Sequence, residues 1–125
     1  MLPPVSRALA RMGYNVAEEV RILGKAVDVV GARAPEPDLV TVELKLSDWK
    51  RAVRQAYVNQ TFGDLAYIAL HEDYAHRVDT EYLRSAGIGF ISVGEDASIV
   101  MEPERRECRN AILASRLWAI VMEGT

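Results

Sequence analysis

The stretch that decides the fold is Leu39-Val40-Thr41-Val42-Glu43-Leu44-Lys45-Leu46, which is followed by Ser47-Asp48. Apolar and polar side chains alternate along it, which is the pattern of a half-buried β-strand. Because successive side chains of a strand point to opposite faces, this strand has an apolar face and a polar face. The polar face carries Thr41, Glu43 and Lys45.

After this strand the spacing changes to that of an amphipathic helix. Ser47 suits the N-cap, and Asp48 suits the first turn, where a carboxylate is favoured by the helix dipole. The side expected to be buried carries Trp49, Ala52, Val53, Ala56, Tyr57 and Gln60, and the other side carries Lys50, Arg51, Arg54 and Gln55. Residues 65–70 read as a buried strand. A strand, a helix and a strand in this order predict a parallel crossover.

Two more strands precede residues 39–46. Residues 14–23 alternate with Val16, Val20 and Ile22 on one face, and residues 26–33 resume as a strand after a turn at Gly24-Lys25. The loop 34–37 contains two prolines, which lack the donor that a central strand needs. Three strands joined by short turns predict an antiparallel meander.

The remaining elements complete an α/β fold. Helices are expected at residues 4–12, 78–85 and 103–122, with a buried strand at 88–93 and a weak edge strand at 98–101. The order predicts a mixed sheet flanked by helices, in which a three-strand meander is joined to parallel crossover strands. At 125 residues we expect a single domain, 1–125.

The composition excludes several classes of protein. Half of the residues are hydrophobic and 26% are charged, as in ordinary globular chains. The 15 basic and 18 acidic side chains give a net charge of −3, which does not suggest nucleic-acid binding but leaves room for a local basic stripe. The longest apolar run, 117–122, is far too short for a membrane span. With a single cysteine, Cys108, and no visible secretion signal, we expect a cytoplasmic protein.

The two turns of the meander are expected to bring acidic side chains together. If Gly24-Lys25 is a two-residue hairpin turn, Glu19 lies one diagonal step from Asp28 on the same face. If residues 34–37 form a four-residue loop, Asp28 lies opposite Glu43. The meander would then bring the carboxylates of Glu19, Asp28 and Glu43 together, with Lys45 two residues after Glu43.

Such a patch suits the hydrolysis of phosphodiesters. Clustered carboxylates repel one another unless a cation offsets their charge. Mg²⁺ prefers oxygen ligands, usually one or two carboxylates with water and a substrate phosphate. An ammonium beside the ion, here that of Lys45, would stabilise the charge of the transition state.

These residues resemble the PD-(D/E)XK nuclease superfamily, and within it the restriction-endonuclease-like and Holliday-junction-resolvase-like proteins. The likeness rests on Asp28, then Glu43-Leu44-Lys45 ending a strand, then a helix that carries Gln55. It covers residues 14–70 for the motifs and continues to residue 93 for a restriction-endonuclease-like fold. It implies metal ligation by Asp28, Glu43 and the backbone carbonyl of Leu44, with Lys45 as the catalytic lysine and Gln55 reaching the site.

The sequence departs from the family at two points. Val27 stands where the family has a proline, and the first helix has no acid where many resolvase-like members carry a glutamate. Glu19 is the expected substitute for that glutamate, with Glu18 less favoured by strand parity. The resemblance implies a nuclease that uses Mg²⁺ or Mn²⁺ and cleaves nucleic acid, with DNA the expected substrate. Its homodimer would present a symmetric pair of sites to two strands.

A basic stripe lies on the same helix as Gln55. Lys50, Arg51 and Arg54 share its polar side, and residues 45–60 carry a net charge of +3. These side chains are candidates for contacts with phosphates. An ordinary solvated helix face explains them equally well.

Three other interpretations remain open. The acidic patch would be purely structural if Arg21 paired with Asp28 and Glu43 with Lys45, since exposed ion pairs of this kind stabilise by only about 0–1 kcal/mol. A catalytically inactive member of the fold would act as a nucleic-acid- or protein-binding module. An oligomeric scaffold would dock the final helix, 103–122, on a partner chain.

Overall fold

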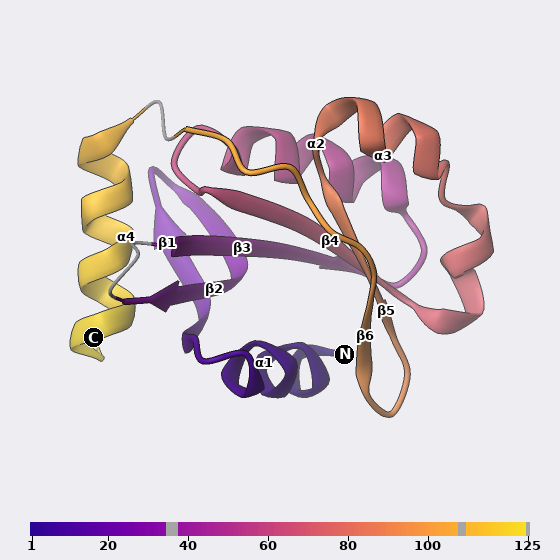
Figure 1. The fold of residues 1–125 in the computed structure, drawn as a ribbon, viewed down its shortest axis with the longest axis horizontal. Helices are drawn as coiled ribbons and strands as arrows, with labels where there is room; N and C mark the ends of the chain where they lie inside the picture. Colours follow the sequence, from indigo (N-terminus) through magenta and orange to yellow (C-terminus); the bar gives the residue numbers. More distant parts are fainter. Residues whose placement is uncertain (35–37, 108–109, 125) are drawn as a thin grey trace.

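A computed structural model describes residues 1–34, 38–107 and 110–124. In this part of the chain six strands form one sheet in the order β1-β2-β3-β4-β5-β6 (Figure 1). They are β1 (Asn15–Ile22), β2 (Lys25–Arg33), β3 (Asp38–Lys45), β4 (Leu65–His71), β5 (Gly89–Val93) and β6 (Ala97–Met101). β1, β2 and β3 are antiparallel, β4 and β5 run parallel to β3, and β6 is antiparallel to β5. The predicted mixed sheet is confirmed.

Helices lie on both sides of the sheet. They are α1 (Leu2–Arg11), α2 (Trp49–Asn59), the 3-10 helix η1 (Glu72–Arg77), α3 (Thr80–Ala86) and α4 (Ala111–Glu123). Figure 1 shows α1 below the sheet, α2 and α3 above it, and α4 beside β1 and β2. Each helical region covers its own group of buried apolar side chains: one under α1, one under α4, and one under α2 and α3.

The turn between β1 and β2 differs from the prediction by one residue. Ile22 pairs with Lys25, so Leu23 and Gly24 form the turn, with φ of 51° and 71°. Positive φ at both central residues is what the common two-residue hairpin turn requires. The prediction was wrong because leucine rarely adopts this conformation. The one-residue error moves the register by two, so Arg21 pairs with Ala26 rather than with Asp28.

β1 changes its buried face at Glu19, where φ is 52°. Val16 packs against the apolar group under α1, whereas Val20 and Ile22 belong to the group under α4. The expectation that these three side chains share one face was therefore wrong. The left-handed backbone of Glu19 breaks the alternation, so the two ends of β1 pack against different apolar groups, one under α1 and one under α4.

The final helix is shorter than predicted, because it begins at Ala111 with the side chain of Asn110 capping Leu113 N. Pro103 to Glu107 are not helical. The backbone N–H groups of Glu104 and Arg106 instead donate to Gly87 and Asp64. Elements α1, β4, α3, β5 and β6 lie within two residues of their predicted ends. Cys108 and most of the 34–37 loop fall outside the described residues. None of the helices described is long and apolar enough to span a lipid bilayer.

Candidate functional site

Asp28 and Glu43 are held together where the backbone pairing of β2 and β3 stops. The ladder runs from Arg33–Asp38 to Val29–Val42, and the same register places Asp28 opposite Glu43. Oδ2 of Asp28 accepts a hydrogen bond from Leu44 N at 2.8 Å. The Asp28 side chain thus replaces the ladder here, and the register sets the two carboxyl groups next to each other.

Glu43 is one of the few buried charged residues, with 1% of its surface exposed. Burial raises the pKa of its carboxyl group, and the nearby charge of Asp28 adds to the rise. A hydrogen bond from Asn59 Nδ2 at 3.1 Å and the positive charge of Lys25 act in the opposite direction. A carboxylate in this position is therefore costly and needs a cation close by.

Lys25 supplies a positive charge that sequence reasoning missed, because the residue was assigned to the turn. It begins β2, and its Nζ donates to Asn59 Oδ1 at 2.7 Å and to the Gln55 carbonyl at 3.2 Å. Burial lowers the pKa of Lys25, and the charges of Glu43 and Asp28 oppose this. The one hint in the sequence concerns its partner, Asn59. This residue lies at helical spacing from Ala52 and Ala56, so it is a polar residue on the buried face of α2.

Lys45 and Gln55 both lie near Lys25. Lys45 is half-buried at the end of β3, paired with Leu70, and its charge acts on Lys25. The side-chain oxygen of Gln55 is buried and has no hydrogen-bond partner in the described chain. A buried acceptor without a donor lowers the stability of the folded protein, so the Gln55 oxygen is a destabilising feature of this region.

Glu19 does not complete the patch as expected. The corrected register brings it directly opposite Asp28, but it is exposed and its backbone is left-handed. Within the described ranges, no three acidic, histidine or cysteine side chains converge closely enough to hold an ion. Neither structural ion pair considered from the sequence, Arg21 with Asp28 or Glu43 with Lys45, forms among the described residues. The expected three carboxylates are thus reduced to two, with two lysines nearby.

The donor set still suits a hard divalent cation. Mg²⁺ commonly takes one or two carboxylates and completes its shell with water or phosphate. Asp28 and Glu43 supply two carboxylates, and the backbone carbonyl of Leu44, the residue after Glu43, is a third oxygen. A dication would also balance the two negative charges, of which that of Glu43 is costly because the group is buried.

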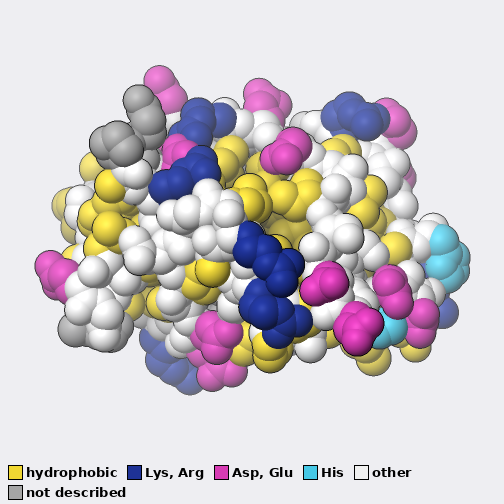
Figure 2. Space-filling model, turned by 60° about the horizontal axis from the view of Figure 1, so that its bottom comes forward, with side chains coloured by type: hydrophobic (Ala, Val, Ile, Leu, Met, Phe, Trp, Pro, Cys, Tyr) yellow, Lys and Arg dark blue, Asp and Glu magenta, His cyan; other side chains and the backbone are white. Residues whose placement is uncertain are grey.

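The predicted basic stripe is exposed on α2. Lys50, Arg51 and Arg54 are all exposed, and none takes part in an ion pair of the described residues. Nζ of Lys50 lies 5.9 Å from the centre of the Trp49 ring. The opposite side of the molecule, which carries α1, mixes basic, acidic and hydrophobic side chains (Figure 2). Because its three side chains are exposed, the stripe on α2 is accessible to an anionic partner.

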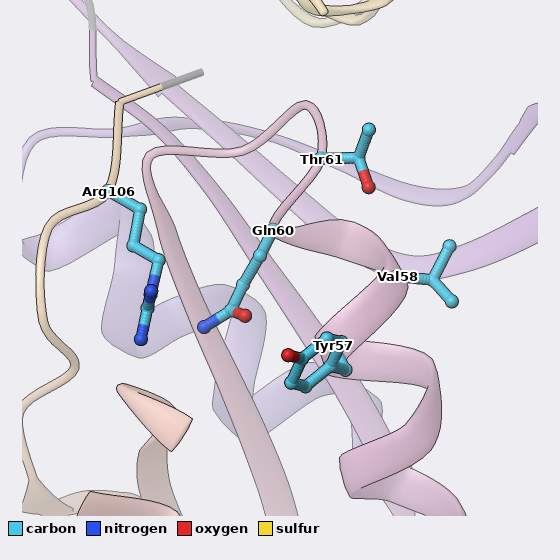
Figure 3. Close-up of a pocket in the computed structure, with 5 residues that line it drawn as sticks. All are labelled: Tyr57, Val58, Gln60, Thr61 and Arg106. Atoms are coloured by element: carbon cyan, nitrogen blue, oxygen red, sulfur yellow. The ribbon is translucent and has the colours of Figure 1, made fainter. Parts of the chain in front are cut away.

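A second feature is a hollow of about 230 Å³ at the end of α2 (Figure 3). Gln60 and Arg106 lie side by side there, and both donate to the Ala86 carbonyl, at 2.9 and 3.0 Å. Tyr57, expected on the buried side of α2, is 62% exposed, and Asn59 takes the buried place. The hollow contains neither of the two carboxylates.

No protein-family model and no curated protein matches the sequence. Among solved structures, the chain is similar to a protein of unknown function from Silicibacter pomeroyi. The two share 23% identity with a TM-score of 0.73, over 97% of this chain and 80% of the other. This likeness shows that the fold occurs in a second protein.

Proposed function

We propose that the protein is a divalent-metal-dependent nuclease of the PD-(D/E)XK type, with a restriction-endonuclease-like fold, that cleaves DNA. The observation that carries the proposal is the hydrogen bond from Leu44 N to Asp28 Oδ2, which holds Asp28 against β3 beside Glu43 and just before Lys45. The order of a helix, a three-strand meander, a helix and a parallel strand supports it.

The proposed roles follow from the chemistry of each group. Asp28, Glu43 and the Leu44 carbonyl would hold Mg²⁺ or Mn²⁺, which when bound polarises a phosphate and lowers the pKa of a water ligand. Lys45 would stabilise negative charge on the reacting phosphate. The unpartnered oxygen of Gln55 would accept a hydrogen bond from the attacking water. Glu19, which is exposed opposite Asp28, would substitute for the glutamate that many resolvase-like proteins carry on their first helix.

Binding of the substrate is assigned to the exposed side of α2. Lys50, Arg51 and Arg54 would contact phosphates, so the affinity for DNA would fall with rising salt. A homodimer that presents two sites to the two strands of a duplex, in a cytoplasmic setting, belongs to the same proposal.

A second candidate is a catalytically inactive nuclease-fold protein that binds nucleic acid or another protein. The burial of Glu43, with Lys25 close enough to offset its charge, favours this alternative. In such a protein the ammonium would replace the metal ion as the neutralising charge.

Cleavage assays with Lys45→Ala separate the two candidates. Single-stranded, duplex, flap and junction DNA are incubated with the unchanged protein in Mg²⁺ and in Mn²⁺. We expect cleavage of at least one substrate and a loss of about 10²–10³-fold in Lys45→Ala. Arg116→Ala removes the charge of an exposed side chain on α4 and should cleave normally. No cleavage by the unchanged protein, or equal cleavage by Lys45→Ala, would overturn the catalytic proposal.

A further inference from the structure

A chain of polar contacts links Lys25 to the buried carboxylate of Glu43. Lys25 Nζ donates to Asn59 Oδ1 at 2.7 Å, and Asn59 Nδ2 donates to Glu43 Oε2 at 3.1 Å. Asn59 is fully buried. We propose that Lys25 is a positioning residue, which acts through Asn59 to hold the Glu43 carboxylate in the orientation that binds a divalent cation. This inference rests on the function proposed above.

The direction of the chain follows from the donors available. An ammonium only donates, so it can bond only to the oxygen of the Asn59 amide. The amide nitrogen is then turned toward Glu43, where it can only donate to an oxygen. Without Lys25, the Glu43 carboxylate alone would orient the amide, and Asn59 Oδ1 would lose the donor that holds it from the other side.

Lys25 acts through Asn59 because it forms no direct ion pair with a carboxylate in the part of the chain described. Its second bond, to the Gln55 carbonyl, fastens the start of β2 to α2. The Lys25 ammonium thus holds both α2, through the Gln55 carbonyl, and the side-chain amide of Asn59. Partners that orient a metal ligand in this way commonly contribute about 10–100-fold to metal affinity.

The test is a double-mutant cycle read by Mn²⁺ calorimetry. We expect Lys25→Met and Asn59→Leu each to weaken Mn²⁺ binding by about tenfold or more. Because Lys25 acts through Asn59, the double variant should bind no more weakly than Asn59→Leu alone. Arg116→Met also removes one positive charge, but from an exposed side chain on α4, and this variant should bind as the unchanged protein does.

A second readout needs neither metal nor catalysis. The side-chain amide resonances of Asn59, identified by their absence in Asn59→Asp, should move toward solvent-exposed values in Lys25→Met. In Lys25→Arg, which keeps a cationic donor, they should stay close to those of the unchanged protein and Mn²⁺ affinity should be largely restored. This readout also serves if Asn59→Leu does not fold.

The outcomes separate this inference from the proposed function. If the unchanged protein binds no Mn²⁺, the proposed function and the metal-directed role of Lys25 both fail. If it binds Mn²⁺ but Lys25→Met binds equally well, or the two substitutions weaken binding additively, only the positioning role is overturned. An unmoved Asn59 amide in Lys25→Met would overturn it as well.

Discussion

The carboxylate of Asp28 accepts a hydrogen bond from the backbone N–H of Leu44, with 2.8 Å between Oδ2 and N. Leu44 lies between Glu43 and Lys45, so this single contact sets the position of Asp28 relative to both. It forms where β2 and β3 no longer pair through their backbones. The site is therefore built from an interruption of the sheet and not from its regular part.

Replacement of Gln55 by methionine is expected to stabilise the protein. The Gln55 side-chain oxygen is buried without a donor in the described chain, and removing such a group relieves about 1 kcal/mol or more. The free energy of unfolding, from urea titration, should rise in Gln55→Met while cleavage of DNA falls. Gln60→Met is the control, because Gln60 Nε2 donates to the Ala86 carbonyl and its loss should destabilise. A less stable Gln55→Met would contradict the assignment of this oxygen as unsatisfied.

Leu23→Asn is expected to raise stability by about 1 kcal/mol, because asparagine tolerates the left-handed conformation better than leucine. Leu23 has φ of 51° and is 75% exposed, so little apolar burial is lost. Thermal unfolding provides the measurement. Leu46→Asn changes another exposed leucine, one without positive φ, and should bring no gain. Equal effects at the two positions would argue against a strained turn at Leu23.

The stability contributed by Asp38 should depend on pH. Burial alone would raise the pKa of Asp38, but hydrogen bonds from Arg33 and Arg105 outweigh it, so the pKa lies below its usual value of 3.8. A lowered pKa in the folded protein means that the contribution is complete above about pH 4. It is lost as the pH falls through the lower, folded value.

Asp38→Asn should accordingly unfold more readily than the unchanged protein at pH 7, with a difference that shrinks toward pH 2. Urea titration across this range measures it. Asp73→Asn, a substitution at an exposed carboxylate, should show little dependence of this kind. A difference between Asp38→Asn and the unchanged protein that grows at low pH would contradict the account.

Much of the fold could be predicted because the spacing of apolar residues along the chain distinguishes strands from helices. The alternation of residues 14–23, 26–33 and 39–46 predicted the meander, and the helical spacing after Ser47 predicted the crossover, without knowledge of any contact. The hairpin register was less accessible, since it depended on Leu23 adopting a conformation that leucine avoids. The same error hid Lys25, which was placed in the turn instead of at the start of β2.

Residues 103–107 show a different limit. Their sequence is compatible with a helix, but hydrogen bonds to residues far away in the sequence hold them in another conformation. Arg105 bonds to Asp38, and Arg106 to the Ala86 carbonyl. In the candidate site, Asp28 and Glu43 were found because their positions follow from strand register. Glu19 was not correctly placed, because its left-handed backbone follows from no local signal.

Calorimetric titration with Mn²⁺ of the unchanged protein and of Asp28→Asn tests the central claim most directly. Asparagine keeps an oxygen that can accept from Leu44 N, so the substitution removes the charge while leaving this contact available. Asp96→Asn, at an exposed carboxylate of the β5–β6 turn, is the matched control. The account predicts that the unchanged protein and Asp96→Asn bind Mn²⁺ alike, and that Asp28→Asn binds more than about tenfold more weakly. Equal binding by Asp28→Asn, or no binding by the unchanged protein, would contradict it.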